Sequence, residues 1–154
     1  MRIDKRLAEL GLTLPQAVPP VANYVPAVRS GSLLFISGQL CLDHGTLKPE
    51  HKGKLGAEIS AEAGYAAARL CAINLLAQAK TALGDLDKIT RCVRLGGFIN
   101  AKPDYAALPA VMNGASDLMV EVLGDAGRHA RTTIGVAELP MDASVEVEAI
   151  FEVA

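Results

Sequence analysis

Hydrophobic residues recur with two different spacings along the chain. In two long segments, 61–83 and 103–123, they return at every third or fourth position, which is the period of an amphipathic helix. A short helix of the same kind is predicted at residues 3–10. Five shorter runs of β-forming residues are predicted strands: 24–28, 33–37, 89–99, 131–138 and 144–153. The predicted order is therefore a short helix followed by β-β-α-β-α-β-β.

The sequence also predicts the ends and the buried sides of the two long helices. Ser60 is a suitable N-cap for the first helix and Gly84 can end it, whereas Gly124 ends the second. The dipeptide 103–104 is expected to open the second helical region, in which Pro109 interrupts or restarts the helix. The stripe of the first helix is expected at Ala66, Leu70, Ile73 and Ala77. The stripe of the second is expected at Leu108, Val111, Ala115, Leu118 and Val122.

Two amphipathic helices can cover only one face of a five-stranded sheet. The other face is predicted from the alternation in the last strands to be small and semi-polar, neither fully solvated nor a normal core. Such a face suggests burial against other subunits, with a site at their junction. The 154 residues fit one α+β domain, in which residues 1–20 form the N-terminal helix and an extended lead-in.

Composition argues against several classes of function. A net charge of −2 with 51% hydrophobic residues describes an ordered globular chain without a field for nucleic acid or an anionic membrane. Three Tyr, three Phe and no Trp are too few for a platform that stacks single-stranded nucleic acid. No apolar run reaches the roughly 18–20 residues that span a bilayer. Three widely spaced cysteines fit neither a disulfide framework nor a zinc site, which favours a reducing, cytoplasmic location.

The candidate chemistry lies in residues 127–151, which are predicted to form two strands joined by a turn at 139–142. Arg131 stands at the mouth of the first strand. A guanidinium keeps its charge and offers a planar fork that matches a carboxylate, so Arg131 suits a small carboxylic acid. An internal salt bridge with Glu146 or Glu148, or an ion pair at an interface, fits the same pattern. The pattern alone leaves these interpretations open.

Glu146 is the acid/base candidate, because a partly buried carboxylate can hold and activate a water molecule. Glu148 lies two positions further on and therefore on the same face of the strand, so the pattern cannot separate the two carboxylates. Tyr24 and Asn113 are the other polar groups able to reach a site. Together these residues predict a carboxylate-binding pocket in an oligomer.

No metal or cofactor site is indicated. The chain has no GxGxxG after a strand, no P-loop, no GxSxG, no HExxH and no CxxC. His44 and His51 lie in the polar, turn-rich segment 43–56, which is a predicted surface loop, and both are expected to be solvated. His129 is the only histidine near the candidate site, so chemistry without a metal or a cofactor is expected.

Several pieces of the chain occur in the order of a known family signature. They are Tyr24, residues 27–40 with Ser37-Gly38-Gln39, Asn113, Ala130-Arg131, residues 136–140 and residues 145–150. In these pieces the chain resembles the Rid family, also called the YjgF or L-PSP family, of reactive-intermediate imine deaminases. The resemblance covers most of residues 20–153, and its C-terminal part is the most specific.

The resemblance implies a chorismate-mutase-like α+β subunit, with both helices on one face of a mixed sheet, and a homotrimer with sites between subunits. It also implies hydrolysis of small 2-imino or enamine acids, such as 2-aminoacrylate, to 2-keto acids and ammonia without a cofactor. By position, Arg131 matches the arginine that binds the substrate carboxylate, and Glu146 matches the glutamate that positions water. Tyr24 and Asn113 match pocket residues, and the backbone N–H of Thr133 would contact the substrate.

The chain departs from the usual family pattern in several places, and residues 113–117 and 127–131 resemble a divergent branch of the family. It adds the N-terminal helix, has a longer loop at 43–56, and carries Ala22-Asn-Tyr-Val25 where the family has Gly-Pro-Tyr-Ser. These differences leave a non-catalytic trimer that binds small carboxylates as the alternative to an enzyme. Endoribonuclease activity has been attached to parts of the family, but the balanced charge and scarce aromatic residues argue against it here.

Overall fold

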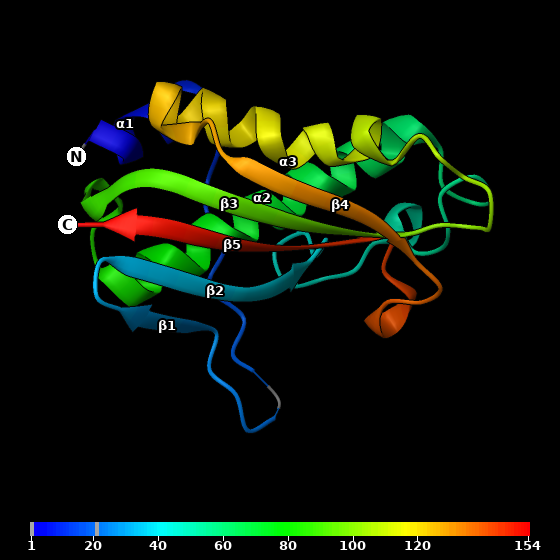
Figure 1. Cartoon of the computed structure of the whole chain (residues 1–154), viewed down its shortest axis with the longest axis horizontal. Coiled ribbons are helices and arrows are strands. Elements are labelled where there is room, and N and C mark those ends of the chain that lie inside the picture. Colours follow the sequence, from blue (N-terminus) through cyan, green and yellow to red (C-terminus); the bar gives the residue numbers. More distant parts are fainter. Residues whose placement is uncertain (1, 21) are drawn as a thin grey trace.

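One five-stranded sheet forms the centre of the molecule, in the order β1–β2–β5–β3–β4 (Figure 1). The computed structural model describes residues 2–20 and 22–154. The strands are β1 (Ala27–Ser30), β2 (Leu33–Leu40), β3 (Ile89–Asn100), β4 (Ala130–Val136) and β5 (Val145–Val153). Neighbouring strands are antiparallel, except that β3 and β4 are parallel. The predicted α+β class and mixed sheet are confirmed.

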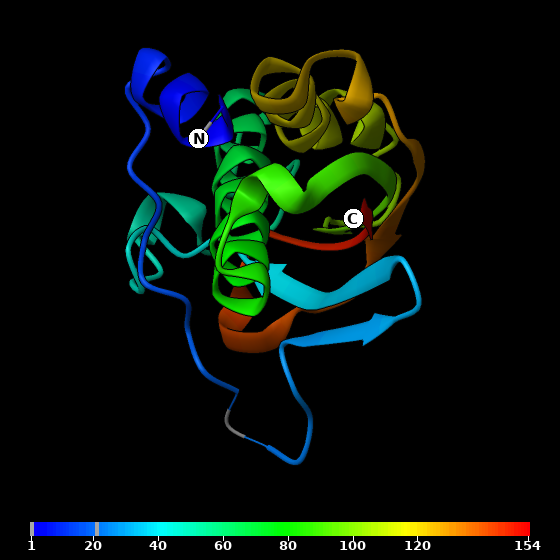
Figure 2. The same ribbon diagram turned by 90° about the vertical axis from the view of Figure 1, so that its left-hand side faces the viewer.

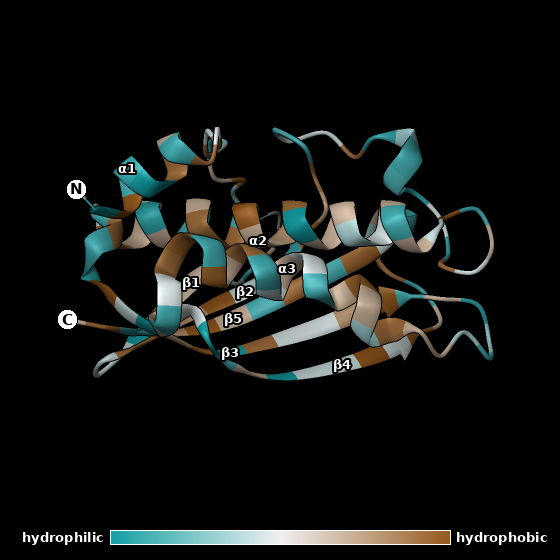
Figure 3. Cartoon of the chain, turned by 90° about the horizontal axis from the view of Figure 1, so that it is seen from above, coloured by the Kyte–Doolittle hydropathy of each residue, from teal (hydrophilic) through white to brown (hydrophobic). Residues whose placement is uncertain are grey.

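Three α-helices lie together on one side of the sheet, as the view from above shows (Figure 3). They are α1 (Arg2–Glu9), α2 (Ala61–Leu83) and α3 (Leu108–Leu123). The core fills the space between helices and sheet, and all three cysteines lie in it with no exposed surface. None of the helices among the described residues is both long and apolar enough to cross a membrane.

The N-terminal helix is attached both to the core and to the segment before β3. Ile3 and Leu7 are buried in the core, and the Asp87 carboxylate accepts hydrogen bonds from the backbone N–H groups of Arg2 and Ile3 at 2.7 and 2.8 Å. The lead-in then runs along the outer side of α2 towards β1 (Figure 2). Gln78 of α2 holds it there by donating to the Val18 carbonyl at 2.8 Å.

Helix α2 has the predicted ends but a different buried side. Ser60 accepts from the Ala63 N–H at 3.1 Å, and Gly84 follows the helix with φ 78°. Of the predicted stripe, Ala77 is buried, and Leu70 and Ile73 are partly buried against the core, but Ala66 is exposed and was predicted wrongly. The buried residues include Ala67, Ala68, Cys71, Ala72, Leu75, Leu76 and Ala79. The sheet, α3 and the lead-in all contact α2. The buried side of α2 is therefore wider than the predicted stripe and is centred on different residues.

Helix α3 starts later than predicted but buries the predicted stripe. It begins at Leu108 with Pro109 in the first turn, where a missing N–H costs nothing. Residues 103–104 precede it as loop, with Asp104 at φ 71°. Of the predicted stripe, Leu108 is partly buried, and Val111, Ala115, Leu118 and Val122 are buried.

The predicted hairpin of the last two strands does not exist. β3 lies between β4 and β5, pairing in parallel with β4 and antiparallel with β5. Every other side chain of β5 is buried, whereas β4 has no buried residue. The more apolar strand takes the centre of the sheet and β4 becomes an edge, so residues 139–142 cross over the end of β3 instead of making a tight turn.

Three smaller features near β1 and β2 complete the fold. β1 begins at Ala27 and not at residue 24, because the preceding residues belong to the lead-in. The register of β2 against β5 shifts between Ile36 and Gln39, where Gly38 lies in a β-bulge. The loop 43–56 contains a 3₁₀-helix (Pro49–His51).

Of the two loop histidines, one was predicted wrongly. His44 is exposed as expected, but His51 retains only 7% of its surface. Its backbone carbonyl accepts from the Ser144 N–H at 3.0 Å at the start of β5. This contact holds the loop against the core, and the histidine is therefore covered.

Helix packing gives the first testable prediction. A Cβ at Gly114 of α3 would overlap the Tyr65 carbonyl of α2, which is backbone and cannot turn away. A Cβ at Gly64 of α2 would meet the ends of Leu55 and Val111 at 2.7 and 3.1 Å, and these can move. Although Gly to Ala usually stabilises a helix, we expect Gly114→Ala to lower the free energy of unfolding by on the order of 1–3 kcal/mol.

Urea denaturation of the two matched variants measures this difference. We expect Gly64→Ala to lower the free energy of unfolding clearly less than Gly114→Ala does. Equal losses, or a gain for Gly114→Ala, would show that the two helices separate freely at this point.

Candidate functional site

Arg131 lies on the helix side of the edge strand β4. Its strand position is paired with Leu95, which is fully buried under the helices. The Nη1 group donates to Asn113 Oδ1 at 2.9 Å and to Ser116 Oγ at 3.0 Å, and Nη2 approaches the Pro109 carbonyl at 3.4 Å. Among residues 2–20 and 22–154, no carboxylate forms an ion pair with Arg131. The structure thus brings Arg131 and Asn113 together, and the described residues hold no internal salt bridge of Arg131.

Glu146 lies on the opposite, open face of the sheet. Its position is paired with Leu40 of β2 and Phe98 of β3, and its carboxylate rests against the bulge at Gly38. A Cβ at Gly38 would overlap the carboxylate oxygen, so this position accepts no side chain unless Glu146 moves. Burial raises the pKa of the Glu146 carboxyl above its ordinary value, and the negative charge of Glu148 adds to this.

The two glutamates that the sequence could not separate have different partners. Glu148 forms an ion pair with Arg94 at 3.3 Å, and both side chains are well exposed. Glu146 has no such partner within the described part of the chain. The structure therefore distinguishes a neutralised surface carboxylate from a half-buried one that is unpaired.

A cavity of about 410 Å³ adjoins Glu146 on the open side of the sheet. Its walls include Pro19, Pro20, Tyr24, Gly38, Met141 and Glu146. The lead-in and the crossover 139–142 thus supply most of an apolar lining around one carboxylate. The structure brings Glu146 and Tyr24 together, as the sequence predicted.

The five predicted residues do not form one site within a single chain. Arg131 and Asn113 lie on the helix side of the sheet, whereas Glu146 and Tyr24 lie at the cavity on the other side. Thr133 is paired with Gly97 and so also faces the helices; its Oγ1 is buried without a hydrogen-bond partner in the described residues. A single chain therefore places the predicted residues in two groups on opposite sides of the sheet, Arg131 with Asn113 and Glu146 with Tyr24.

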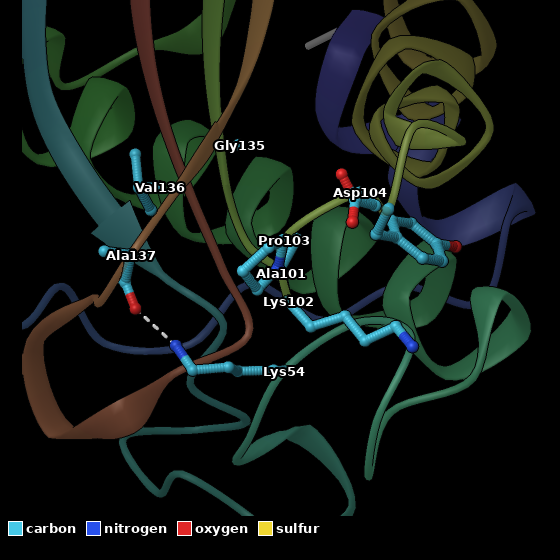
Figure 4. Close-up of a pocket in the computed structure, with 9 residues that line it drawn as sticks. Lys54, Ala101, Lys102, Pro103, Asp104, Gly135, Val136 and Ala137 are labelled. Carbon is cyan, nitrogen blue, oxygen red and sulfur yellow. Dashed lines mark hydrogen bonds between the residues drawn. The ribbon is translucent and has the colours of Figure 1, made fainter.

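Another cavity, of about 550 Å³, contains none of the predicted residues (Figure 4). It lies beside Lys54, which donates to the Ala137 carbonyl and to Asn100 Oδ1 and pairs with Glu138 at 3.1 Å. This cation is already paired with a carboxylate, which makes it a poor binding group for a second one. Residues 2–20 and 22–154 hold no cluster of three His, Cys, Asp or Glu side chains suited to a metal.

Sequence reasoning missed Ser116 and undervalued His129. Ser116 Oγ lies 2.8 Å from His129 Nε2, and His129 Nδ1 lies 2.6 Å from the Gly127 carbonyl. A signal was present: Ser116 is three positions after Asn113 on α3, and His129 is two positions before Arg131. These spacings place both pairs on a common face.

Known proteins are similar to this chain in both fold and sequence. A family model described as "YjgF/chorismate_mutase-like, putative endoribonuclease" matches residues 4–153. The chain belongs to this family. The YjgF/chorismate-mutase-like fold expected from the sequence is thereby confirmed.

Three similar proteins illustrate the range of sequence identity and of names among the relatives. Protein TCP17 of Trypanosoma cruzi is 45% identical over 152 residues, covering 98% of this chain and 94% of that protein. The crystal structure of Atu1372 from Agrobacterium tumefaciens, described as of unknown function, has 48% identity and a TM-score of 0.90 over 99% of this chain and 92% of that one. A 2-iminobutanoate/2-iminopropanoate deaminase of Dermatophagoides farinae is 29% identical over 139 residues, covering 90% and 92% of the two chains.

The raised pKa of Glu146 predicts a stability effect with a definite sign. The folded state holds the Glu146 proton to higher pH than the unfolded state, so stability falls as pH rises from the unfolded towards the folded pKa. We therefore expect Glu146→Gln to raise the Tm at neutral pH. The difference should vanish in acid below the ordinary pKa of a glutamate, where both side chains are neutral.

Thermal unfolding at the two pH values checks this, with Glu152→Gln as the control. Glu152 is an exposed residue of the same strand that accepts from Thr90 Oγ1 at 2.8 Å, and glutamine can still accept there. An unchanged or lower Tm for Glu146→Gln at neutral pH would contradict the prediction.

Proposed function

We propose that this protein hydrolyses small reactive 2-imino acids and their enamine tautomers to 2-keto acids and ammonia. One observation carries the proposal: the neighbouring pair Arg94–Glu148 is neutralised, whereas Arg131 and Glu146 lack ionic partners among the described residues. An unpaired guanidinium suits a substrate carboxylate, and an unpaired half-buried carboxylate suits a base. The deaminase name of the Dermatophagoides relative supports the same reaction.

In the proposed reaction, Arg131 holds the substrate carboxylate and Glu146 removes a proton from water. The water oxygen bonds to the imine carbon, and the electron pair of the C=N bond moves to nitrogen. Glu146 returns its proton to that nitrogen, which gives the neutral carbinolamine. The hydroxyl proton then moves to the nitrogen through Glu146, and the C=O bond forms as the C–N bond breaks, which releases ammonia and leaves the 2-keto acid. The imine carbon is already electrophilic, so orientation and a positioned water suffice. The raised pKa makes Glu146 a stronger base than a solvated glutamate.

The same proposal includes a homotrimer with its sites between subunits. Arg131 and Glu146 lie on opposite sides of one sheet, so a small substrate reaches both only if they come from different copies. The open face supports such an assembly, because Val28, Phe35 and Ile134 are 50%, 40% and 45% exposed there. A cyclic arrangement would join the edge strand β4 of one copy to the cavity of the next.

Removing the proposed carboxylate-binding group tests the reaction. With an imine generated in situ by an amino-acid oxidase, we expect Arg131→Ala to lower kcat/KM for ammonia release by on the order of 100-fold. Arg94→Ala is the control, because it removes an arginine that already pairs with Glu148. Equal activity in wild type and Arg131→Ala would exclude the proposed role.

The alternative is a non-catalytic protein that binds small carboxylates. It would be established if 2-ketobutyrate raised the Tm of the wild type but not of Arg131→Ala, with no imine hydrolysed by either. The uncharged acceptors around Arg131 are compatible with both functions, so the assay must measure binding and turnover together.

Mixing inactive variants tests the shared site. Arg131→Ala and Glu146→Gln should each be inactive alone, but a mixed cyclic trimer regains one intact site. Random reassembly of equal amounts after mild denaturation should restore about a quarter of the wild-type activity. No recovery, with mixed oligomers shown by native mass spectrometry, would mean that both groups act from one copy.

A further inference from the structure

A chain of hydrogen bonds leads from a backbone carbonyl to the guanidinium of Arg131. His129 Nδ1 lies 2.6 Å from the Gly127 carbonyl, His129 Nε2 lies 2.8 Å from Ser116 Oγ, and Ser116 Oγ lies 3.0 Å from Arg131 Nη1. All these contacts are within hydrogen-bonding distance. These hydrogen bonds connect the segment before β4 to Ser116 of α3, and Ser116 in turn to Arg131 of β4.

The donor and acceptor groups at the two ends determine the direction of each hydrogen bond between them. The Gly127 carbonyl can only accept, so in the neutral form of the imidazole Nδ1 carries the hydrogen and Nε2 is an acceptor. Ser116 therefore donates its hydroxyl hydrogen to His129, and its oxygen lone pairs remain to accept from Arg131. Without His129, the hydroxyl of Ser116 would be free to rotate.

The partners of Arg131 differ from those of the four arginines that pair with carboxylates. Ion pairs with carboxylates are formed by Arg6, Arg69, Arg94 and Arg128. Arg131 instead bonds uncharged acceptors, the Asn113 amide oxygen, the Ser116 hydroxyl and the Pro109 carbonyl. These contacts fix its orientation and leave its positive charge uncancelled.

The two short contacts of the guanidinium both involve Nη1, whereas Nη2 makes only the longer contact of 3.4 Å with the Pro109 carbonyl. Asn113 and Ser116 both hold Nη1, and they are three positions apart on α3, so the same helical face supplies both. The Nε–H has no partner within residues 2–20 and 22–154, and it lies on the same edge as one Nη2–H. Two parallel N–H groups on one edge match the two oxygens of a carboxylate.

We propose that Ser116 and His129 are positioning residues that set the carboxylate-binding edge of Arg131, with His129 acting only through Ser116. This inference rests on the proposed function for the identity of the ligand, a 2-keto or 2-imino carboxylate. A guanidinium held in place before binding loses less conformational freedom when the ligand arrives. We call the pair Ser116 and His129 the brace. The brace therefore tightens ligand binding and has no part in breaking or forming bonds.

Binding of pyruvate, measured by calorimetry, tests the brace with matched variants. Ser116→Ala should weaken binding about tenfold, because it removes a hydrogen bond to a charged group. Ser116→Thr keeps the hydroxyl and should stay within about twofold of wild type. His129→Phe should weaken binding, and His129→Gln, whose amide oxygen can replace Nε2, should largely restore it.

Dependence of His129 on Ser116 is tested by a double variant. If His129 acts only through Ser116, the variant carrying both Ser116→Ala and His129→Phe should bind pyruvate no more weakly than Ser116→Ala alone. In the imine assay, KM should rise while kcat stays nearly unchanged, because the brace binds ground state and transition state alike. Asp117→Ala is the control on the same helix, since Asp117 bonds Tyr65 and not Arg131.

A second measurement does not depend on any ligand or reaction. Nuclear magnetic resonance of the Arg131 guanidinium should show slow rotation about the Nε–Cζ bond in the wild type and fast rotation in Ser116→Ala. Slow rotation in the wild type together with absent pyruvate binding and absent hydrolysis would reject the proposed function and keep the brace. Unchanged rotation and unchanged pyruvate binding in Ser116→Ala would overturn the brace.

Discussion

The central position of β5 determines where every candidate group lies. β5 pairs with both β2 and β3, and its apolar residues Val145, Val147 and Phe151 are buried on the side that faces the helices. The period of a strand then forces Glu146 onto the open face. The same placement moves β4 to the edge of the sheet, where Arg131 can reach α3. Packing of one apolar strand thus separates the carboxylate from the cation.

Charge pairing then decides which groups remain available for a ligand. On the open face Arg94 neutralises Glu148, and near the Lys54 cavity Glu138 neutralises the lysine. Glu146 keeps a raised pKa because burial costs the charged form and Glu148 lies nearby. Arg131 is oriented by neutral groups and keeps its full charge. The distribution of partners, more than the shape of any cavity, distinguishes Arg131 and Glu146 from the other charged groups and supports their proposed roles.

Much of this could be predicted from sequence, because local signals determined it. Ser60 and Gly84 mark the ends of α2 through backbone capping, and the stripe of α3 follows from its period. The hairpin prediction failed because adjacency in sequence does not determine strand order: β3, more than thirty residues upstream, competes for the side of β5. The stripe of α2 was misplaced because alanines give little contrast between its buried and exposed sides. Burial of His51 and the brace on Arg131 depend on contacts between distant segments.

The cysteines described with the core acquire a meaning in the light of imine chemistry. Electrophilic carbon of this kind is attacked by thiolates, so an exposed thiol in such a protein would be a target for its own substrate. A hydrogen bond from Cys71 holds the pKa of Cys41 at about 6, and burial raises that of Cys92 to about 12. Yet Cys41, Cys71 and Cys92 all have no exposed surface. The fold keeps all three thiols out of solution, which under the proposed function would protect them from alkylation by reactive imines.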